Sequence, residues 1–566
     1  MAKYKRAEAL LEILNANGID TIFINPGLDT TPVQTAILKY MSSGKRSPHL
    51  ILNLDESVAM SAAHGNYMVT GKPQVVMVHA ELGTLQVGGA LHNAQWGRVP
   101  LLFLAGSPSE TRRLTWMQQP YDQGSIVRNS VKWDHCIDSQ ENFFEVFQKA
   151  FQIACTEPTG PVYLTYPINY LGEEIEENPV FTAAPPGGLP FSGNDIEDLN
   201  RISQILLAAE QPLILTGFSG RYAQSVDKLV ELAETLSVPV LAGPNRMNFP
   251  TTHPLCAGIE KGPSKRRNPY VTDADVVLVI DYDTPYVPAM EAPARDANIL
   301  GIGVEPSTQG KLIWGRGLDL FIKADSREAI PALTDMIKAK ITPAKRSFYG
   351  ERFKQLEKVH KDRQKECHTL AMNVSNQKPI SSDWLCKCIN DTITEDTILV
   401  NHVISHFESI AEQIHRTKPG TLLSCPGGSI SWALGASLGA KLAAPDKTVV
   451  SLVTDGGFIW GCPVATLWAA RSHKAPFLSI IFDNQAYGAI RSIVSRNADG
   501  RLSDDIGLQV GVDITSPPDY SAVARACGGY GVTVENPVDI LLALKEGLAQ
   551  VHAGKAAVLD VKLGKE

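Results

Sequence analysis

One stretch in the last quarter of the chain limits the possible folds more than any other. Its apolar run Thr448–Val453 predicts a buried parallel strand. Asp455-Gly456-Gly457 then predicts a turn, Pro463–Ser472 a helix and Pro476–Phe482 a second buried strand. This order of elements is one β-α-β unit, which requires a parallel sheet. Ligands of open parallel sheets bind at the carboxyl ends of the strands, so we expect a site beside the turn.

The residues at the two strand ends have a specific chemistry. Asp455 follows the first strand and Asn484 follows the second, and their oxygens are hard ligands that suit Mg²⁺. Gly456 and Gly457 let backbone N–H groups approach an anion, and a helix N-terminus favours negative charge. An isolated D-G-G would more often be a turn with a capping aspartate. With Asn484 at this distance, and Tyr487-Gly488 after it, the stretch predicts a site for Mg²⁺ and a diphosphate.

The same stretch resembles the G-D-G…N-N motif of thiamine diphosphate (ThDP) enzymes. It departs from that motif at Thr454 and Asp483, which replace the first glycine and the first asparagine, and its spacing is longer than in close relatives. The resemblance implies that Asp455, Asn484 and the carbonyl of Ala486 hold Mg²⁺. It also implies that ThDP lies against Gly456, Gly457, Tyr487 and Gly488.

The totals of the chain argue against several classes of protein. The net charge is −8 and no long basic run is present, so a nucleic-acid partner is not expected. No apolar run is long enough to cross a membrane, so a membrane partner is not expected. The resemblance to ThDP enzymes implies a small-molecule substrate. The nine cysteines are scattered without metal-binding spacing, which indicates reduced thiols and a cytoplasmic protein.

Helix and strand patterns alternate along most of the 566 residues, which is typical of α/β domains. We expect three doubly wound domains, over residues 1–175, 195–340 and 375–566, with a Pro- and Gly-rich linker after the first. A charged connecting helix is expected over residues 338–371. The expected strands are Asp20–Ile24, Leu50–Leu54, Gln74–His79, Pro100–Ala105 and Pro161–Thr165 in the first domain, and Pro212–Thr216, Pro239–Ala242, Asp275–Ile280 and Ala297–Val304 in the second. Three such units resemble the pyrimidine-binding, middle and diphosphate-binding domains of ThDP decarboxylases.

The middle domain contains only a weak glycine signature, Gly217-Phe218-Ser219-Gly220, after its first strand. A full G-x-G-x-x-G is absent, so a structural role is favoured over a dinucleotide site. FAD is therefore not expected as a cofactor.

Glu56 lies where a buried strand meets a helix rich in small residues. A carboxylate at such a junction either caps the helix or needs a polar partner, because its burial is unfavourable. The resemblance implies the second role, in which Glu56 is catalytic and hydrogen-bonds the aminopyrimidine ring of ThDP.

His79 lies at the end of another strand, and its distance from Glu56 resembles that in benzoylformate decarboxylases, where a histidine relays protons. The loop Asn25-Pro26-Gly27 matches the same enzymes, but Leu28 stands where they have a serine that handles the substrate carboxylate. Asp29 is expected either in the substrate pocket or at a helix cap. Glu81 is expected either in a salt bridge or facing the pocket, where its charge would disfavour a substrate carboxylate.

The third domain adds further residues by resemblance. Gly428 would offer its carbonyl to the cofactor amine, and Ile430 would wedge ThDP into its bent shape. Ser405 and His406 would contact the diphosphate, and His402 would lie nearer the reacting carbon. Ala489 and Ile493 would make the substrate pocket apolar.

Together these resemblances imply non-oxidative, ThDP- and Mg²⁺-dependent decarboxylation of a 2-oxo acid to an aldehyde, with carboligation to a hydroxyketone as a second outcome. The alternatives are an acetolactate-synthase-like carboligase, an aldehyde or acyloin lyase, and, more remotely, a catalytically silent subunit of the same fold. Because Glu56 and Asp455 fall in different domains, the family pattern implies a homodimer or homotetramer with sites at subunit interfaces.

Overall fold

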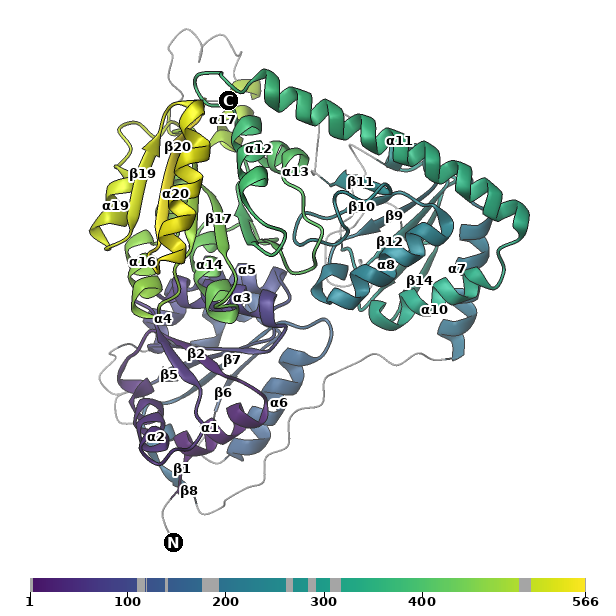
Figure 1. Ribbon diagram of the computed structural model, residues 1–566. Helices are drawn as coiled ribbons and strands as arrows, with labels where there is room; N and C mark the ends of the chain where they lie inside the picture. The colour runs from purple at the N-terminus through teal and green to yellow at the C-terminus, as the bar shows by residue number, and fades with distance from the viewer. Residues whose placement is uncertain are drawn as a thin grey trace.

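The computed structural model describes residues 4–108, 118, 120–137, 141–175, 193–260, 268–283, 292–305, 317–497 and 510–564. Three α/β bodies are visible: the third packs on the first, and the middle one lies to the side (Figure 1). Each body contains a six-stranded sheet. The expected fold class, three doubly wound α/β domains, is confirmed. The expected linker after the first domain falls largely on residues outside these ranges.

The first sheet has the strand order β3-β2-β4-β5-β7-β6, and all of its pairs are parallel. Every residue of β4 and β5 is buried, because helices cover both faces of the sheet. The strands are β2 (Thr21–Ile24), β3 (His49–Leu52), β4 (Gln74–Val78), β5 (Leu101–Ser107), β6 (Trp133–Cys136) and β7 (Pro161–Pro167), and the helices are α1 (Arg6–Ala16), α2 (Thr31–Ser42), α3 (Glu56–Thr70), α4 (Ala80–Gln86), α5 (Gly88–Trp96) and α6 (Phe143–Cys155). A short antiparallel pair, β1 (Tyr4–Lys5) with β8 (Glu174–Ile175), closes this domain.

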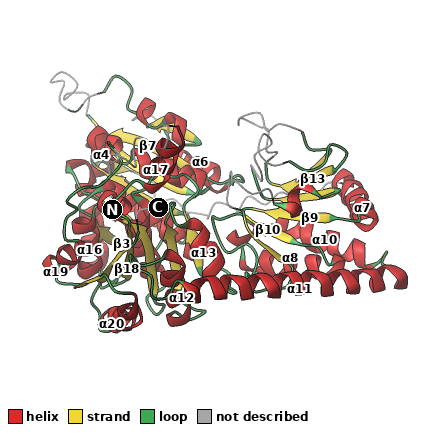
Figure 2. Cartoon of the chain, turned by 90° about the horizontal axis from the view of Figure 1, so that it is seen from above, coloured by secondary structure: helices red, strands yellow, loops and turns green. Residues whose placement is uncertain are grey.

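The middle sheet has the order β11-β10-β9-β12-β13-β14 and is also parallel. Its elements are α7 (Gly193–Ala208), β9 (Pro212–Thr216), α8 (Ala223–Leu236), β10 (Val240–Ala242), β11 (Cys256–Ile259), α9 (Pro269–Thr272), β12 (Val276–Ile280), β13 (Asn298–Gly303), β14 (Leu320–Lys323) and α10 (Ser326–Lys338). The long, mostly exposed helix α11 (Pro343–Asn373) runs beside this domain to reach the third (Figure 2).

The third sheet has the order β16-β15-β17-β18-β20-β19. Its strands are β15 (Ile398–His402), β16 (Leu422–Ser424), β17 (Val449–Thr454), β18 (Leu478–Asp483), β19 (Tyr530–Val534) and β20 (Ala557–Lys562), and its helices are α12 (Ser382–Thr392), α13 (Phe407–Gln413), α14 (Trp432–Ala443), α15 (Asp455–Trp460), α16 (Pro463–Ser472), α17 (Gly488–Asn497), α19 (Tyr520–Ala526) and α20 (Ile540–His552). One expectation was wrong in detail. The turn expected at residues 455–457 is the start of α15, because the hydroxyl of Thr454 accepts a hydrogen bond from Gly457 N–H and caps a helix there.

The first and third domains share one hydrophobic core through α3 and α14. Small residues allow these helices to approach closely: a Cβ on Gly439 would lie 1.8 Å from the carbonyl oxygen of Ala62, and one on Gly65 would lie 2.1 Å from that of Ala436. No side chain larger than hydrogen fits at either position, so the two domains pack backbone against backbone.

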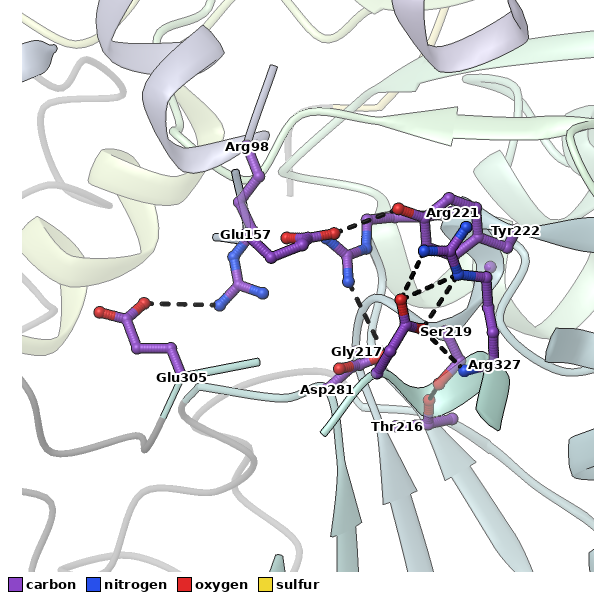
Figure 3. Close-up of polar contacts among 12 residues, drawn as sticks. Arg98, Glu157, Thr216, Gly217, Ser219, Arg221, Tyr222, Asp281, Glu305 and Arg327 are labelled. Atoms are coloured by element: carbon purple, nitrogen blue, oxygen red, sulfur yellow. Dashed lines mark hydrogen bonds and ion pairs between the residues drawn. The ribbon is translucent and has the colours of Figure 1, made fainter. Parts of the chain in front are cut away.

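The first and middle domains are joined by buried ion pairs (Figure 3). Arg221 of the middle domain donates to both oxygens of Glu157, at 2.9 and 3.0 Å, and Arg98 of the first domain donates to Asp283 at 2.7 Å. Burial alone would raise the pKa of Glu157, but the charge and hydrogen bonds of Arg221 hold it below its ordinary value. Each domain thus supplies an arginine to a carboxylate of the other.

The weak glycine signature of the middle domain has a packing explanation. A Cβ on Gly217 would lie 2.5 Å from the ring of Tyr282, and one on Gly243 would lie 3.0 Å from it. Tyr282 follows the carboxyl end of β12, and β12 lies next to β9, where the strand order of the sheet reverses. Ligands of such sheets bind at this point, and here the Tyr282 ring packs against the glycines beside it. This supports a structural role for these glycines.

Candidate active site

Four neighbouring strands of the first sheet bring the predicted residues to one edge. In the order β3, β2, β4 and β5, the segments after the first three strands carry Glu56, the Asn25–Asp29 loop and His79, and Gly106 lies at the end of the fourth. Parallel strands end at the same side of a sheet, so residues far apart in sequence become neighbours.

Glu56 is the first residue of α3, and the side chain of Asp55 caps that helix by accepting from Val58 N–H at 3.1 Å. The Glu56 carboxyl is half-buried, is hydrogen-bonded by Asn25 and lies beside His79. Burial first, and then the negative charge of Asp55, raise its pKa above the usual value. Glu56 is therefore a carboxyl group that holds a proton more readily than an exposed glutamate.

Asp29 lies beneath His79 and does not line an open pocket. Its side chain is 1% exposed, and its Oδ1 is 2.7 Å from His79 Nδ1. Its Oδ2 accepts from the N–H groups of Gly106, at 2.7 Å, and Ala80, at 3.2 Å. The expectation that Asp29 faces the substrate or caps a helix is thus replaced by a different arrangement, in which it binds the histidine of the site.

The two other first-domain residues lie at the surface of this edge. Leu28 is 59% exposed. Glu81 lies in the first turn of α4, and among the described residues its Oε2 is buried without a hydrogen-bond partner and no ion pair is formed. The salt bridge expected for Glu81 is therefore not formed with any residue in the described ranges.

The edge of the third sheet brings Asp455 and Asn484 together with the loop after β18. Asp455 is 1% exposed; its Oδ1 accepts from Gly456 N–H at 2.7 Å, and its Oδ2 has no hydrogen-bond partner within the described chain. Burial first, and then the nearby charge of Asp483, raise the pKa of Asp455 to about 7. A buried carboxylate oxygen without a partner, at the end of the strand next to the one that leads into Asn484, fits a small divalent cation such as Mg²⁺. The Ala486 carbonyl, which accepts from Gly488 N–H at 2.9 Å, has a second lone pair for the same ion.

Asp483, which replaces an asparagine of the motif, is paired with a lysine side chain. In the parallel pair of β18 and β20, Asp483 is opposite Lys562, and the two side chains form an ion pair. Lys562 also pairs with Asp560 at 2.8 Å. The extra carboxylate of this chain is therefore partly neutralised from within its own sheet.

The residues expected to bind the diphosphate form a narrow cradle. A Cβ on Gly488 would lie 2.7 Å from Ser405 Oγ and 2.8 Å from Asn484 Nδ2, so only glycine fits between them. Gly456 lies against the ring of Tyr487, whose hydroxyl accepts from Trp460 Nε1 at 3.3 Å. Asn484 Nδ2 is buried without a hydrogen-bond partner among the described residues, so this donor is available to an anion in the cradle.

Gly428 and Ile430 lie on the loop before α14. Gly428 has a φ of +79° with open space around its Cα, and Ile430 is only partly buried, with its carbonyl against Gly457. Neither residue is part of the domain core, so both are available to a ligand in this cradle.

The remaining predicted residues divide into buried and exposed ones. His402 is 7% exposed, meets Trp432 edge-on with ring centroids 5.9 Å apart, and burial lowers its pKa to about 4. His406 is buried against Phe482. Both histidines lie inside the third domain, whereas Ala489 is exposed and Ile493 is 47% exposed on α17. The structure thus places His402 in the domain interior, away from the exposed apolar residues expected to surround a substrate.

Glu56 and Asp455 make their contacts in separate domains. The neighbours of Glu56 are Asn25, His79 and Gly83, whereas those of Asp455 are in the third domain. Exposed apolar side chains surround both edges. They are Leu28, Leu54, Leu82 and Leu85 in the first domain, and Ile404, Ile459, Trp460, Tyr487, Ile490 and Ile493 in the third. Patches of this kind usually mark a surface that a partner covers.

Comparison with known proteins gives matches along the chain. Residues 5–126, 199–333 and 405–561 match the N-terminal, central and C-terminal domain models of thiamine pyrophosphate enzymes. The chain is 24% identical to the benzoylformate decarboxylase of Pseudomonas aeruginosa, with 96% of each protein covered. It is 22% identical to the acetolactate synthase isozyme 3 large subunit of Escherichia coli, with 98% of this chain and 94% of that protein covered.

Solved structures match over the full length as well. The 4-hydroxybenzoylformate decarboxylase of Rhodococcus jostii RHA1 superposes with a TM-score of 0.78 at 23% identity, covering 100% of both chains. The benzoylformate decarboxylase of Polynucleobacter necessarius gives a TM-score of 0.78 at 20% identity, covering 99% of both chains. These structures share the fold of this chain.

Proposed function

This chain belongs to the thiamine pyrophosphate enzyme family, and on that basis we propose that it is a ThDP- and Mg²⁺-dependent decarboxylase of 2-oxo acids. The product is an aldehyde, or a hydroxyketone when a second carbonyl compound is the acceptor. The observation that carries the proposal is that Glu56 with His79 at one sheet edge, and Asp455 with Asn484 at another, each have the chemistry that one end of the cofactor needs.

The residues of the third domain would hold the cofactor. Asp455, Asn484 and the Ala486 carbonyl would bind Mg²⁺, and Ser405, His406 and Gly488 would surround the diphosphate. Gly428 and Ile430 would contact the ring system from the open loop before α14. When bound, ThDP supplies an electron sink for the carbon that loses CO₂.

The residues of the first domain would handle protons. Glu56, whose pKa is raised by burial, would donate a hydrogen bond to a ring nitrogen of the aminopyrimidine. His79 would carry a proton at its Nε2, the ring nitrogen not bound to Asp29, and deliver it to the carbon from which CO₂ has left. The exposed apolar residues Leu28, Ala489 and Ile493 would exclude water from the side chain of the substrate.

The two sheet edges of one site would come from two subunits. Glu56 and Asp455 have separate neighbours within one chain, and apolar side chains are exposed at both edges. A symmetric dimer, or a tetramer built from it, would bury both patches and complete two sites at each interface. We therefore propose a homodimer or homotetramer.

A lyase that acts on aldehydes or acyloins is the second candidate. Leu28 stands where a serine would handle a substrate carboxylate. Glu81, on the helix that follows His79, has a buried Oε2 that no described residue hydrogen-bonds. A negative charge there would disfavour a substrate that is itself an anion.

A substrate panel tests the proposal. The purified protein with ThDP and Mg²⁺ is given pyruvate, branched-chain 2-oxo acids, phenylpyruvate and benzoylformate, each with and without an aldehyde acceptor. Mass spectrometry follows CO₂ and the organic products. CO₂ with an aldehyde or hydroxyketone supports decarboxylation, whereas hydroxyketone made from aldehydes alone, with no CO₂ from any acid, would transfer the assignment to the lyase.

We also expect a cytoplasmic enzyme. None of the nine cysteines forms a disulfide, as is usual in a reducing compartment. Within the ranges that the structure describes, no helix is both long and apolar enough to cross a membrane.

A further inference from the structure

We propose that Asp29 is a positioning residue for His79: it fixes the ring so that the proton sits on Nδ1 and the lone pair of Nε2 faces the reaction. This inference rests on the proposed function for its catalytic meaning, but the tautomer itself can be measured without turnover. The proposal begins from a contact between residues that are 50 positions apart in the chain.

The oxygens of Asp29 are divided between two tasks. Oδ2 accepts hydrogen bonds from two backbone N–H groups, that of Gly106 at 2.7 Å and that of Ala80 at 3.2 Å. These two bonds fix the position of Oδ2. Oδ1 is then the atom that faces His79 Nδ1, at 2.7 Å. An ionised carboxylate has no proton to donate, so Nδ1 must be the donor of this bond.

The backbone around this contact is shaped to allow it. A Cβ on Gly27 would lie 2.0 Å from His79 Nδ1, and a Cβ on Gly106 would lie 2.3 Å from Cβ of Asp29. Ala80 has a φ of +45°, a conformation that is unfavourable by about 1 kcal/mol for a residue with a side chain. Its N–H points to Asp29, so the carboxylate stabilises the strained turn directly after His79.

Nε2 is the free end of the ring. The His79 side chain is 25% exposed, and among the described residues no hydrogen bond reaches Nε2. The charged groups that act on His79 are Asp29, from the loop after β2, and Glu56, from α3. With Nδ1 protonated and bound, neutral His79 can only accept a proton at Nε2. The imidazolium so formed can return that proton to the reacting carbon, and Asp29 stabilises the positive charge meanwhile.

The Asp29→Asn variant has a definite expected consequence. The amide oxygen of the new side chain is needed by the N–H groups of Gly106 and Ala80, so its NH₂ group must face His79. Nδ1 then has to accept, and the proton of neutral His79 moves to Nε2. The variant differs from the wild type by one atom type, so it tests the tautomer and changes the shape of the site very little.

The test is nitrogen NMR of the cofactor-free protein labelled with ¹⁵N-histidine, with the signals of His79 assigned from the His79→Gln variant. We expect Nδ1–H in the wild type and Nε2–H in Asp29→Asn. Asp325→Asn is the matched control, because Asp325 is a buried carboxylate that caps α10 in the middle domain. It should leave the His79 signals unchanged. An Nε2–H tautomer in the wild type overturns the proposal, and this result needs no variant to fold. An unchanged tautomer in folded Asp29→Asn overturns it equally.

Turnover gives the second readout. On the substrate that the panel identifies, Asp29→Asn should lower kcat about 100-fold with little change in KM, because proton transfer is impaired and binding is not. An unchanged kcat with a changed tautomer would overturn the positioning role. If no substrate is turned over at all, the proposed function fails, whereas the NMR result still decides whether Asp29 sets the tautomer.

Discussion

Lys562 forms an ion pair with Asp483, the residue opposite it in the neighbouring strand. Asp483 directly precedes the candidate metal ligand Asn484, so the lysine places a positive charge close to the candidate metal site. The carboxylate of Asp483 is fully buried, and it also accepts from Gln485 N–H at 3.1 Å. This pair explains how an aspartate can replace the first asparagine of the motif with its charge partly compensated, since Lys562 is shared with Asp560.

Replacing Lys562 with methionine should therefore destabilise the protein. The variant would leave Asp483 buried beside Asp455 and Asp560, and loss of one partner of a buried pair costs roughly 3 kcal/mol. Urea unfolding measures the change in the free energy of unfolding. The double variant Lys562→Met with Asp483→Asn should recover part of it, since Asp483 is then neutral and only Asp560 has lost its ion-pair partner. A double variant as unstable as the single one would contradict this explanation.

Glu56→Gln should abolish most turnover and leave the fold intact. The variant keeps the size of the side chain but removes the proton that a carboxyl group can hold, so we expect a loss of at least about 100-fold in kcat. Glu351→Gln, on the exposed surface of α11, is the control and should behave as wild type. Circular dichroism and thermal melting check that both variants are folded. Near-normal activity of Glu56→Gln would refute the role assigned to Glu56.

Asp455→Asn should weaken Mg²⁺-dependent binding of ThDP by at least about tenfold, because the charge of its ligands sets the affinity of such an ion. Isothermal titration with ThDP in the presence and absence of EDTA measures the effect. Binding that is indifferent to both EDTA and the substitution would remove Asp455 from the metal site.

Mixing the two inactive variants tests where the sites lie. If each site takes Glu56 from one subunit and Asp455 from the other, a dimer of Glu56→Gln with Asp455→Asn has one doubly damaged site and one intact site. The isolated mixed dimer should then have about half of the wild-type activity, and a randomly paired mixture about a quarter. Co-expression with two affinity tags provides the mixed dimer. No recovery in a verified mixed dimer would show that each site belongs to a single chain.

Two buried histidines should make stability fall in weak acid. His64 and His402 both meet the ring of Trp432, at 5.3 and 5.9 Å, and burial lowers their pKa values to about 3 and about 4. Their folded pKa values lie below the unfolded value near 6.5, so the stability they contribute is present above that pH and is lost as the pH falls towards 4.

Each histidine should add about 1.4 kcal/mol of lost stability per pH unit in that window. Urea unfolding at pH 7, 6 and 5 measures the slope. His402→Phe should reduce the slope by the contribution of one histidine, about 1.4 kcal/mol per pH unit. Glu351→Gln, which alters an exposed side chain, should leave the slope unchanged. A slope unaffected by His402→Phe would mean that this histidine is protonated in the folded protein.

The sequence was informative where a polar or charged residue follows an apolar strand closely along the chain. The places of Asp455 and Asn484 at strand ends could be predicted because an apolar run precedes each of them, and the place of Glu56 because it comes two residues after the expected strand Leu50–Leu54. The structure contains strands at those places, with ends shifted by a residue or two.

Other features could not be predicted because their partners are distant in sequence. Nothing near Asp29 indicates that it binds His79, and nothing near Lys562 indicates that it pairs with Asp483, since strand order creates both contacts. The strands β6 and β19 were missed because their residues are mostly only partly buried, so their sequences carry no continuous apolar run.

The close packing of α3 on α14 has a mechanical consequence. α3 begins at Glu56, and α14 begins just after Ile430, so the two helices carry the proton-handling edge and the cofactor-shaping loop of the same chain. Because their backbones touch at Gly65 and Gly439, neither helix can slide without the other. In the proposed dimer these edges serve different sites. A displacement of α3 at one active site would then displace α14 at the other, because the contact between the two helices contains almost no side chain that could absorb the movement.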